Sequence, residues 1–466
     1  MKFSASASAS LALTALASVS AKPINLRRTW PMPQYQPQDM AGMGSSNSNS
    51  NNNVMNMDHS SNSNSNNTMA QLNPHCANDT ANGGNGNFPG ALYFMTNEPD
   101  GSNLVIHGIN NDGTLTFTGV LPIGGVGSKE VTDPVDVDPL GSQASVKVSG
   151  NSIFIANAGS STVSMFNIDP NDPINPTMAG FPISSGGEFP ISLTVSKKSG
   201  QVCVVNTGAV NGISCYTSDP KLGLTPVPNT IRSLNLDQTT PPSAPINTAS
   251  QVVFTDDGQR LLVSVKGNPG FVASWDVNED GSLSPDFVKN TPSDGGLLSG
   301  LSNIGKSKDI PALVITDAAL GVNVFKFDDN QVKSKASNTP LPIDGQNGIS
   351  WAEFSPVTGN FYVTDKGTAT LTEIAVADDL KASVVGQTKL IENSATIDLE
   401  IATIGDKDFA YVMAPNAGVI NVLDLQSPGK VVKIEDKDFC QSLSKAGVKF
   451  DPVNIQAMNA FFVGVL

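Results

Sequence analysis

The sequence predicts an all-β fold: a single seven-bladed β-propeller of four-stranded blades, closed into a ring by the C-terminal strand and preceded by a disordered N-terminal tail. Three observations support this prediction. The 466 residues include 42 Gly and 31 Pro and only 15% charged residues, a composition that favours turns over helical bundles. A strand–turn unit recurs seven times beyond residue 90. Asp-Gly turns join alternating strands in INNDGTLTF from Ile109 and VNEDGSLS from Val277.

The charge balance excludes two classes of partner. The 27 basic and 42 acidic residues give a formal net charge of −15. Such a chain lacks the basic surface that binds nucleic acid or anionic lipid. We expect neither partner, and we expect a monomer.

The first element is a secretory signal, assigned to residues 1–21. Lys2 precedes the apolar stretch 11–19, and Val19-Ser20-Ala21 is a small-x-small cleavage site. The apolar stretch is too short to span a bilayer. We therefore expect a secreted protein, extracellular or in the cell wall. The pair Arg27-Arg28 offers a second, dibasic processing site, although two adjacent arginines in a tail are more often incidental.

The second element is a disordered tail over residues 22–86. From residue 45 to residue 67, 18 of 23 residues are Ser or Asn, so this stretch has little to bury. The chain has two N-glycosylation sequons, at Asn66 and Asn78, and both precede the propeller, which is assigned to residues 87–466. Glycans would therefore decorate the tail.

Four cysteines suit an oxidising compartment. Cys203 and Cys215 flank a Gly-containing turn in VCVVNTGAVNGISCY, which predicts a hairpin with a cross-strand disulfide. Cys76 precedes the first repeat and Cys440 follows the last one, so a disulfide between them would tie the two ends of the ring together. The alternative, four free thiols, does not suit a secreted chain.

The repeats are defined by an apolar run that ends at Asn, Asp or an equivalent residue and leads into a turn and a second run. The end residues are 48 to 60 positions apart, a period typical of propeller blades. The set is Asn97, Asn157, Asn206, Val265, Asp317, Asp365 and Pro415.

A hydroxyl residue precedes six of these end residues by 12 to 19 positions and predicts the start of the innermost strand of each blade. Antiparallel pairing would then bring both marks to one face of the disc. The hydroxyl residues are Ser145, Ser192, Ser250, Ser302, Ser350 and Thr396.

The final segment closes the ring. The first repeat has no inner strand of its own, and QAMNAFFVGVL from Gln456 has no blade of its own. We expect residues 460–466 to pair beside residues 91–97. A glycosylphosphatidylinositol signal is the alternative for this apolar end, but the segment is short and cleavage would leave the ring open.

Several motifs, taken in order, add a family resemblance. The segments ALYFMTNEPDGSNLVIHGINNDGTLTFTG, GEFPISLTVSKKSGQVCVVNTGAVNGISCY and NLDQTTPPSAPINTASQVVF resemble fungal secreted proteins labelled 3-carboxymuconate cyclase. These belong to the wider seven-bladed lactonase group that includes 6-phosphogluconolactonase-like enzymes. The resemblance covers about residues 87–466. It implies lactone opening or closing at one end of the channel and, in several fungi, a role as a secreted or cell-wall antigen.

The chain departs from the lactonase pattern at its catalytic positions. The lactonases open an inner strand with Arg-His, whereas this sequence has Ser250-Gln251 and Ser350-Trp351 at the matching places. A tricarboxylate substrate would require several positioned cations. Four arginines are present in all, and only Arg232 is loosely placed to serve. His107 stands alone in a blade strand, where a histidine is more often a packing residue than a catalyst.

The channel mouth should be formed by loops after the end residues and before the inner strands. A carboxylate near a lysine there could perform acid–base chemistry on a lactone. Glu188 is the most informative carboxylate because no other repeat has its counterpart. The predicted catalytic residues are Glu188, Lys266 and Asp365, with Lys366 as a second cationic candidate.

Substrate binding is assigned to four further residues. Trp351 could floor a pocket and stack on a sugar or a flat lactone. For Asp317 and Asp365 the better alternative is a turn-capping role, which explains why Asn and Asp interchange at these positions. The predicted binding residues are Glu98, Trp351, Asp317 and Gln251.

Metal and cofactor sites are not expected. Asp133, Asp136 and Asp138 could together hold Ca²⁺, but their spacing matches no defined calcium loop and favours a solvated acidic loop. The Gly-rich piece at 124–127 lies between no strand and helix, so no phosphate-binding loop is implied. Two functions stay open: a lactonase-like or cycloisomerase-like enzyme acting on a small lactone, and a non-catalytic glycoprotein that binds a ligand such as a glycan.

Overall fold

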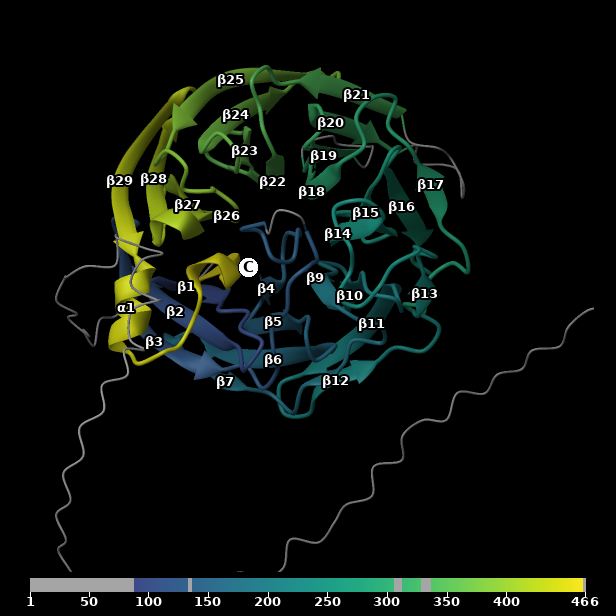
Figure 1. The fold of residues 1–466 in the computed structure, drawn as a ribbon, viewed down its shortest axis with the longest axis horizontal. Helices are drawn as coiled ribbons and strands as arrows, with labels where there is room; N and C mark the ends of the chain where they lie inside the picture. The colour runs from purple at the N-terminus through teal and green to yellow at the C-terminus, as the bar shows by residue number, and fades with distance from the viewer. Residues whose placement is uncertain (1–87, 133–135, 306–311, 328–336, 464–466) are drawn as a thin grey trace, which may run out of the picture. The chain divides into compact units, whose positions relative to one another are not determined.

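The computed structural model of the protein describes residues 88–132, 136–305, 312–327 and 337–463. Within these ranges, seven antiparallel sheets stand side by side around a ring (Figure 1). This arrangement confirms the predicted seven-bladed propeller. The assigned signal and tail, with both glycosylation asparagines, lie outside the described residues.

Blades 1 to 3 are numbered in ring order, and each is listed from the channel outward. Blade 1 comprises β30 (Gln456–Phe462), β1 (Gly90–Met95), β2 (Asn103–Ile109) and β3 (Leu115–Pro122). Blade 2 comprises β4 (Val146–Ser149), β5 (Ser152–Asn157), β6 (Thr162–Asp169) and β7 (Asp172–Met178), with β8 (Ile183–Ser184) beside β6. Blade 3 comprises β9 (Pro190–Val195), β10 (Val202–Asn206), β11 (Gly212–Asp219) and β12 (Gly223–Pro226), with β13 (Arg232–Ser233) beside β11.

Blades 4 to 7 follow the same plan. Blade 4 comprises β14 (Thr248–Phe254), β15 (Arg260–Lys266), β16 (Phe271–Asp276) and β17 (Val288–Asn290). Blade 5 comprises β18 (Leu298–Asn303), β19 (Ala312–Asp317), β20 (Gly321–Lys326) and β21 (Ser337–Pro342). Blade 6 comprises β22 (Ile349–Phe354), β23 (Phe361–Asp365), β24 (Thr370–Val376) and β25 (Ala382–Lys389). Blade 7 comprises β26 (Leu399–Ile404), β27 (Lys407–Ala414), β28 (Val419–Ser427) and β29 (Lys430–Asp438), and the helical pieces are η1 (Pro415–Ala417), α1 (Phe439–Lys445) and η2 (Pro452–Asn454).

The hydrophobic core lies between the faces of neighbouring blades. Second strands are covered on both faces, so β10 reads VCVVN and every residue in it is buried. Outermost strands face solvent, so β29 reads KVVKIEDKD and each of its residues is exposed or partly exposed. Strands in the middle of a blade therefore have continuous apolar sequences, whereas the strands farthest from the channel mix apolar and polar residues.

The end residues of the repeats and the hydroxyl residues that precede them lie on one edge of the sheets, as predicted. The end residues close or directly follow the second strands, as Asn157 closes β5 and Asp365 closes β23. The hydroxyl residues lie close to the starts of the inner strands, with one shift: β18 begins at Leu298, four residues before Ser302. Antiparallel geometry therefore brings the loops at these two marks together.

Hydroxyl groups link neighbouring blades near this edge. Ser145 Oγ donates to the carbonyl of Ile191 in the next blade at 2.6 Å. Thr316 Oγ1 donates in the same way to the carbonyl of Ser350 at 2.7 Å. Buried hydroxyls thus satisfy inner-strand carbonyls that have no partner in their own sheet.

Ring closure uses an earlier part of the C-terminal segment than the sequence predicts. Strand β30 pairs antiparallel with β1, from Gly90 opposite Phe462 to Met95 opposite Gln456. Pairing therefore involves residues 456–462 instead of 460–466, and residues 464–466 lie outside the described part. The Gln456 side chain accepts from Leu140 N at 3.4 Å and donates to Asp398 Oδ2 at 3.1 Å.

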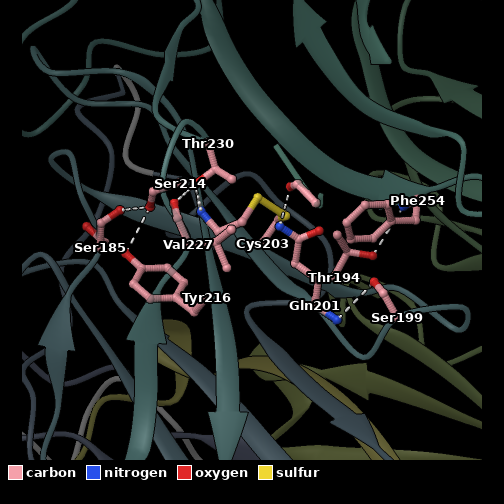
Figure 2. Close-up of a disulfide and its surroundings, with 12 residues drawn as sticks. Ser185, Thr194, Ser199, Gln201, Cys203, Ser214, Tyr216, Val227, Thr230 and Phe254 are labelled. Atoms are coloured by element: carbon pink, nitrogen blue, oxygen red, sulfur yellow. Dashed lines mark hydrogen bonds between the residues drawn. A yellow bond between two sulfur atoms is a disulfide. The ribbon is translucent and has the colours of Figure 1, made fainter. Parts of the chain in front are cut away.

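The predicted hairpin disulfide is present. Cys203 in β10 and Cys215 in β11 are direct cross-strand partners with their Cα atoms 4.0 Å apart (Figure 2). Cys215 N also donates to Thr230 Oγ1 at 3.1 Å. Cys440 is buried in α1, and Cys76 lies outside the described residues, so the second disulfide stays a prediction.

Candidate functional site

A cavity of about 410 Å³ opens at the channel mouth where the inner strands begin. Blades 4, 5 and 6 supply part of its wall, and the loop between β3 and β4 crosses the mouth to supply the rest. Its charged lining consists of Glu130, Asp136, Asp138, Lys266 and Lys366. We call this the axial chamber.

The three carboxyl groups come from the β3–β4 loop. Glu130 N donates to the carbonyl of Pro139 at 2.7 Å, which folds the loop back on itself. Asp138 Oδ1 accepts from Gly141 N at 3.0 Å, an Asx-type turn that fixes the Asp138 side chain. Asp136 N donates to Thr132 Oγ1 at 2.9 Å. Hydrogen bonds within the loop therefore fix its backbone at Glu130 and Asp136 and the carboxyl group of Asp138.

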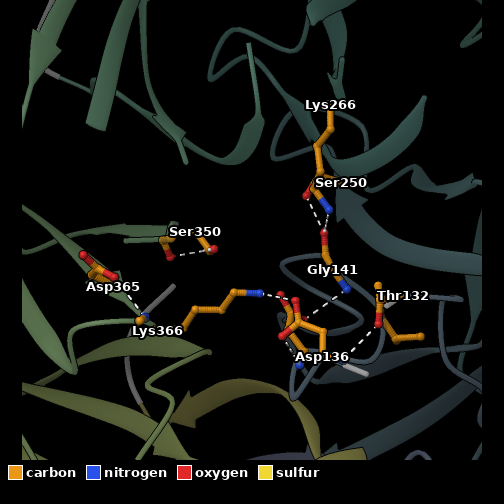
Figure 3. A network of polar contacts seen from close by, with 12 residues as sticks. Thr132, Asp136, Gly141, Ser250, Lys266, Ser350, Asp365 and Lys366 are labelled. Carbon is orange, nitrogen blue, oxygen red and sulfur yellow. Dashed lines mark hydrogen bonds and ion pairs between the residues drawn. The ribbon is translucent and has the colours of Figure 1, made fainter. Parts of the chain in front are cut away.

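The two lysines come from the ends of second strands, where the repeats place their end residues. Lys266 closes β15, is only 6% exposed, and donates through Nζ to the carbonyl of Gly141. Lys366 follows β23 and forms an ion pair with Asp136 across the mouth (Figure 3). Strands from two blades thus direct their ammonium groups at one loop.

Gly141 permits the close approach of acid and lysine. Its φ of +53° is one that glycine adopts readily. A Cβ atom at this position would lie 2.6 Å from both Glu130 Oε2 and Lys266 Nζ. The glycine therefore leaves space that both side chains occupy.

Burial separates the protonation behaviour of the two enclosed carboxyls. Glu130 and Asp138 are 8% and 5% exposed. Desolvation raises the pKa of Glu130 to about 8, although Lys266 opposes the shift. Desolvation raises the pKa of Asp138 to about 6, with Lys366 opposing. At neutral pH the chamber therefore holds one protonated and one ionised carboxyl.

The lysine opposite them stays charged. Burial acts to lower the pKa of Lys366, but the nearby Asp138 and Asp136 outweigh it and raise that pKa. Glu130 Oε1 is buried and has no hydrogen-bond partner among the described residues. A buried acceptor without a partner is costly, and a ligand in the chamber could supply the missing partner.

Of the three predicted catalytic residues, the structure brings Lys266 into the chamber. Asp365 accepts from the backbone N–H groups of Asn347 at 2.8 Å and Gly367 at 3.0 Å. Glu188 Oε2 accepts from Thr240 Oγ1 and is not part of the chamber wall. Glu188, Asp365 and Trp351 therefore do not join Lys266 in one chamber, because turn contacts hold Asp365 and a hydroxyl from the segment before β14 holds Glu188.

The predicted binding residues are also held by contacts within the protein. Asp317 is fully buried and accepts from three backbone N–H groups and the Asn323 amide, the capping arrangement given as the alternative. Glu98 Oε1 accepts from Asp451 N at 2.7 Å. Trp351 is 1% exposed within the core, and Gln251 accepts from the backbone of Leu301. None of the four belongs to the chamber lining.

Sequence reasoning missed Glu130 and assigned a different role to Asp136 and Asp138. The sequence favours a solvated acidic loop over a calcium site, but Asp136 forms an ion pair with Lys366 and Asp138 is buried, while Asp133 lies outside the described residues. No group of three metal-ligating Asp, Glu, His or Cys side chains occurs in the part of the chain that the structure describes. Glu130 carries no motif, so nothing in the sequence pattern singled it out.

His107 is a packing residue. Its ring stacks on Phe94 with 5.5 Å between centroids and meets Phe117 edge-on at the same distance. Burial, with a smaller effect from Lys437, lowers the pKa of His107 to about 3. It therefore stays neutral in the core of blade 1 and does not carry protons at neutral pH.

Comparison with known proteins supports the fold. No protein-family model matches the chain, and no curated protein matches its sequence. Among solved structures, a periplasmic gluconolactonase from Pseudomonas aeruginosa aligns with a TM-score of 0.56 at 15% identity, covering 75% of this chain and 96% of that one. A proposed 6-phosphogluconolactonase from Bacteroides fragilis aligns with a TM-score of 0.55 at 14% identity, covering 80% and 98%.

A third match is a proposed 6-phosphogluconolactonase from Bacteroides uniformis, with a TM-score of 0.54 at 14% identity, covering 79% of this chain and 98% of that one. These similarities establish that the chain has the seven-bladed propeller fold of lactonase-like proteins, in agreement with the resemblance drawn from its motifs. Among the described residues, no helix is both long and apolar enough to cross a bilayer.

Proposed function

We propose that the protein is an enzyme that hydrolyses lactones in the axial chamber. The observation that carries this proposal is the pair Glu130 and Asp138, two enclosed carboxyls with separated pKa values beside two lysines. Environments that push two carboxyl pKa values apart are the usual sign of an acid and a base acting together. The fold of the lactonase-like neighbours agrees with this chemistry.

Each group has a defined part in the reaction. Asp138, ionised at neutral pH, takes a proton from a water molecule as its oxygen forms a bond to the lactone carbonyl carbon. Lys266 stabilises the oxyanion, since an ammonium has three N–H donors and one is used on Gly141.

Glu130, protonated at neutral pH, gives its proton to the ring oxygen as the acyl C–O bond breaks. The product is a hydroxy acid, and solvent exchange returns the proton from Asp138 to Glu130. The same groups acting in reverse would close a lactone, so a cycloisomerase-like reaction uses identical residues.

Lys366 and Asp136 form the outer part of the proposed active site. Their ion pair lies at the mouth, with side chains 25% and 35% exposed, between solvent and the enclosed carboxyls. The positive charge of Lys366 lowers the pKa of Asp138 toward neutrality, which keeps that group available as a base. We assign Lys366 to the tuning of Asp138 and to attraction of the polar substrate.

We also propose that the chain is secreted and glycosylated on its tail. The signal at residues 1–21, the sequons at Asn66 and Asn78, and the disulfide between Cys203 and Cys215 support this proposal. Mass spectrometry of the protein from its native culture medium tests it, since intracellular retention or an unmodified tail would contradict it.

A substrate panel tests the catalytic proposal. Purified protein is incubated with δ-gluconolactone, the aryl lactone dihydrocoumarin and carboxymuconolactone, and acid release is followed. We expect turnover of at least one lactone, and loss of about a hundredfold or more in kcat for Asp138→Asn but not for Glu188→Gln.

Absence of any turnover above buffer by the wild type would overturn the proposal and favour the non-catalytic binding protein. Loss of activity in Glu188→Gln, with Asp138→Asn unaffected, would return the catalytic role to Glu188.

A further inference from the structure

A second cavity adjoins the axial chamber. It has a volume of about 420 Å³, and Glu130 and Thr132 line both cavities. We call it the side chamber. Its remaining wall comes from the ends of β1 and the β3–β4 loop and from a segment that precedes β14.

A strap of backbone covers both chambers. Val131 N donates to the carbonyl of Pro242 at 2.8 Å, and Ala244 N donates to the carbonyl of Val131 at 3.0 Å. Pro241 faces the side chamber, whereas Ala244 and Pro245 face the axial chamber. One strap therefore positions the roof of both cavities.

Side-chain hydrogen bonds fix the floor of the side chamber. Asn97 Nδ2 donates to the carbonyl of Ser128 at 2.8 Å, and Ser128 N donates back to Asn97 Oδ1 at 3.2 Å. Glu98 holds Asn454, another residue of the wall, at 3.1 Å from its Oε1. The amide groups at the floor are therefore occupied by the protein itself.

The surface left for a ligand is mainly apolar. Pro99, Val131 and Pro241 line the side chamber, and the Val131 residue is 57% exposed although it is anchored through its backbone. A cavity of about 150 Å³ is enough to hold a benzene ring, so 420 Å³ has ample room for an aryl or alkyl group. The axial chamber presents Lys266 and Lys366, whereas the lining of the side chamber includes one lysine, Lys129.

We propose that the substrate is a lactone carrying an apolar substituent: its ester group lies in the axial chamber beside Glu130, and its aryl or alkyl part lies in the side chamber against Pro99, Val131 and Pro241. This inference rests on the proposed lactone hydrolysis. The second observation that supports it is Glu130 Oε1, which is buried at the junction of the two chambers and has no hydrogen-bond partner in the part of the chain that the structure describes.

The test separates binding from turnover. Dihydrocoumarin and δ-gluconolactone serve as substrates, and their non-hydrolysed lactam counterparts serve as ligands in calorimetric titrations. Val131→Trp fills the side chamber while its backbone contacts with the strap remain. Val210→Trp is the matched control, because Val210 is also a half-exposed valine but lies in blade 3 and lines neither chamber.

We expect the wild type to bind the aryl lactam at least tenfold more tightly than the sugar lactam. Val131→Trp should weaken aryl-lactam binding and raise the KM for dihydrocoumarin by at least tenfold, with δ-gluconolactone unaffected and Val210→Trp unchanged. Preference for the sugar lactam, or equal binding of the aryl lactam by both variants, would overturn the inference. Lactam binding without turnover of any lactone would overturn the proposed hydrolysis alone.

Discussion

The two ends of the propeller channel both hold carboxyls with raised pKa values near lysine, yet they differ in how these carboxyls are hydrogen-bonded. At the end opposite the axial chamber, Glu400 accepts from Asn459 Nδ2 at 2.7 Å and from Ala460 N at 3.2 Å. Glu353 beside it accepts from Gln143 Nε2 at 2.8 Å, and Lys147 lies close enough to lower the pKa of both. In the axial chamber, Glu130 Oε1 has no such partner.

This difference separates a structural carboxyl from a reactive one. Burial raises the pKa of Glu400 to about 8, the same value that it gives Glu130. A raised pKa is therefore not sufficient to identify an acid that reacts. Both partners of Glu400 come from β30, the inner strand of the adjacent blade, and link the two strands, whereas Glu130 comes from a loop and its Oε1 has no hydrogen-bond partner among the described residues. Unused hydrogen-bonding capacity, not protonation alone, distinguishes the candidate site.

The largest expected effect compares the two glutamates directly. Glu130→Gln should lower kcat for a lactone substrate by about a hundredfold or more, because the proton donor to the leaving oxygen is lost. Glu400→Gln should keep kcat within about twofold. Initial rates at pH 7 measure both. Equal losses in the two variants would show that the ends of the channel are not functionally distinct.

A pair of glycine substitutions tests the close packing of the axial chamber. Gly141→Ala places a Cβ atom 2.6 Å from Glu130 and Lys266, and such a displacement could reduce kcat/KM by up to about a hundredfold. Gly405→Ala is the matched control at the opposite edge, since Gly405 also has positive φ, of +63°, with no atom within 4 Å of the added Cβ. Both variants should lose some stability, but only the first should lose activity; a similar kcat/KM for the two would contradict the crowded geometry.

The pH dependence of kcat/KM should be bell-shaped, with limbs near pH 6 and pH 8. Activity falls about tenfold per pH unit below the pKa of Asp138, where the base is protonated, and above that of Glu130, where the acid is ionised. Glu400→Gln should keep the alkaline limb, although Glu400 has a similar pKa. Loss of the alkaline limb in Glu400→Gln would show that this limb arises from Glu400 and not from Glu130.

The smallest expected effect is on stability. The pKa of Glu400 in the folded state, about 8, exceeds its ordinary value of 4.5, so the folded protein binds more protons than the unfolded chain between these values. Its unfolding free energy therefore falls as pH rises from 4.5 to 8, by at most about 1.4 kcal/mol per pH unit. Glu400→Gln should remove this loss. Denaturant unfolding at pH 5 and pH 8 measures the unfolding free energy of both proteins. The same dependence on pH in the wild type and in Glu400→Gln would show that Glu400 is not a neutral acid in the folded state.

The features that recur from blade to blade could be predicted from the sequence. Blades 2 to 7 each form their strands from one continuous repeat, and Asp317 and Asp365 could be assigned a capping alternative from their positions in that repeat. The cross-strand disulfide was equally local. These features depend on residues within one hairpin, and seven examples of the pattern support each other.

The site depends on contacts that do not repeat. Glu130 and Asp138 lie in an irregular loop that reaches across the mouth to lysines more than a hundred residues later in the chain. Lys266 and Lys366 could be predicted because they follow second strands, whereas the loop's path across the ring has no periodic signal. The four-residue shift in the closing strand has a similar origin, because its register is set against β1 at the other end of the chain.

Ring closure also fixes the order in which the site is assembled during synthesis. Gln456 on β30 holds the backbone of Leu140 in the β3–β4 loop and the carboxylate of Asp398 in blade 7. The ribosome makes β30 after every other described strand, so the loop that bears Glu130 and Asp138 cannot receive this contact while translation of the blades is still under way. We therefore expect activity only in molecules whose closing strand has been made.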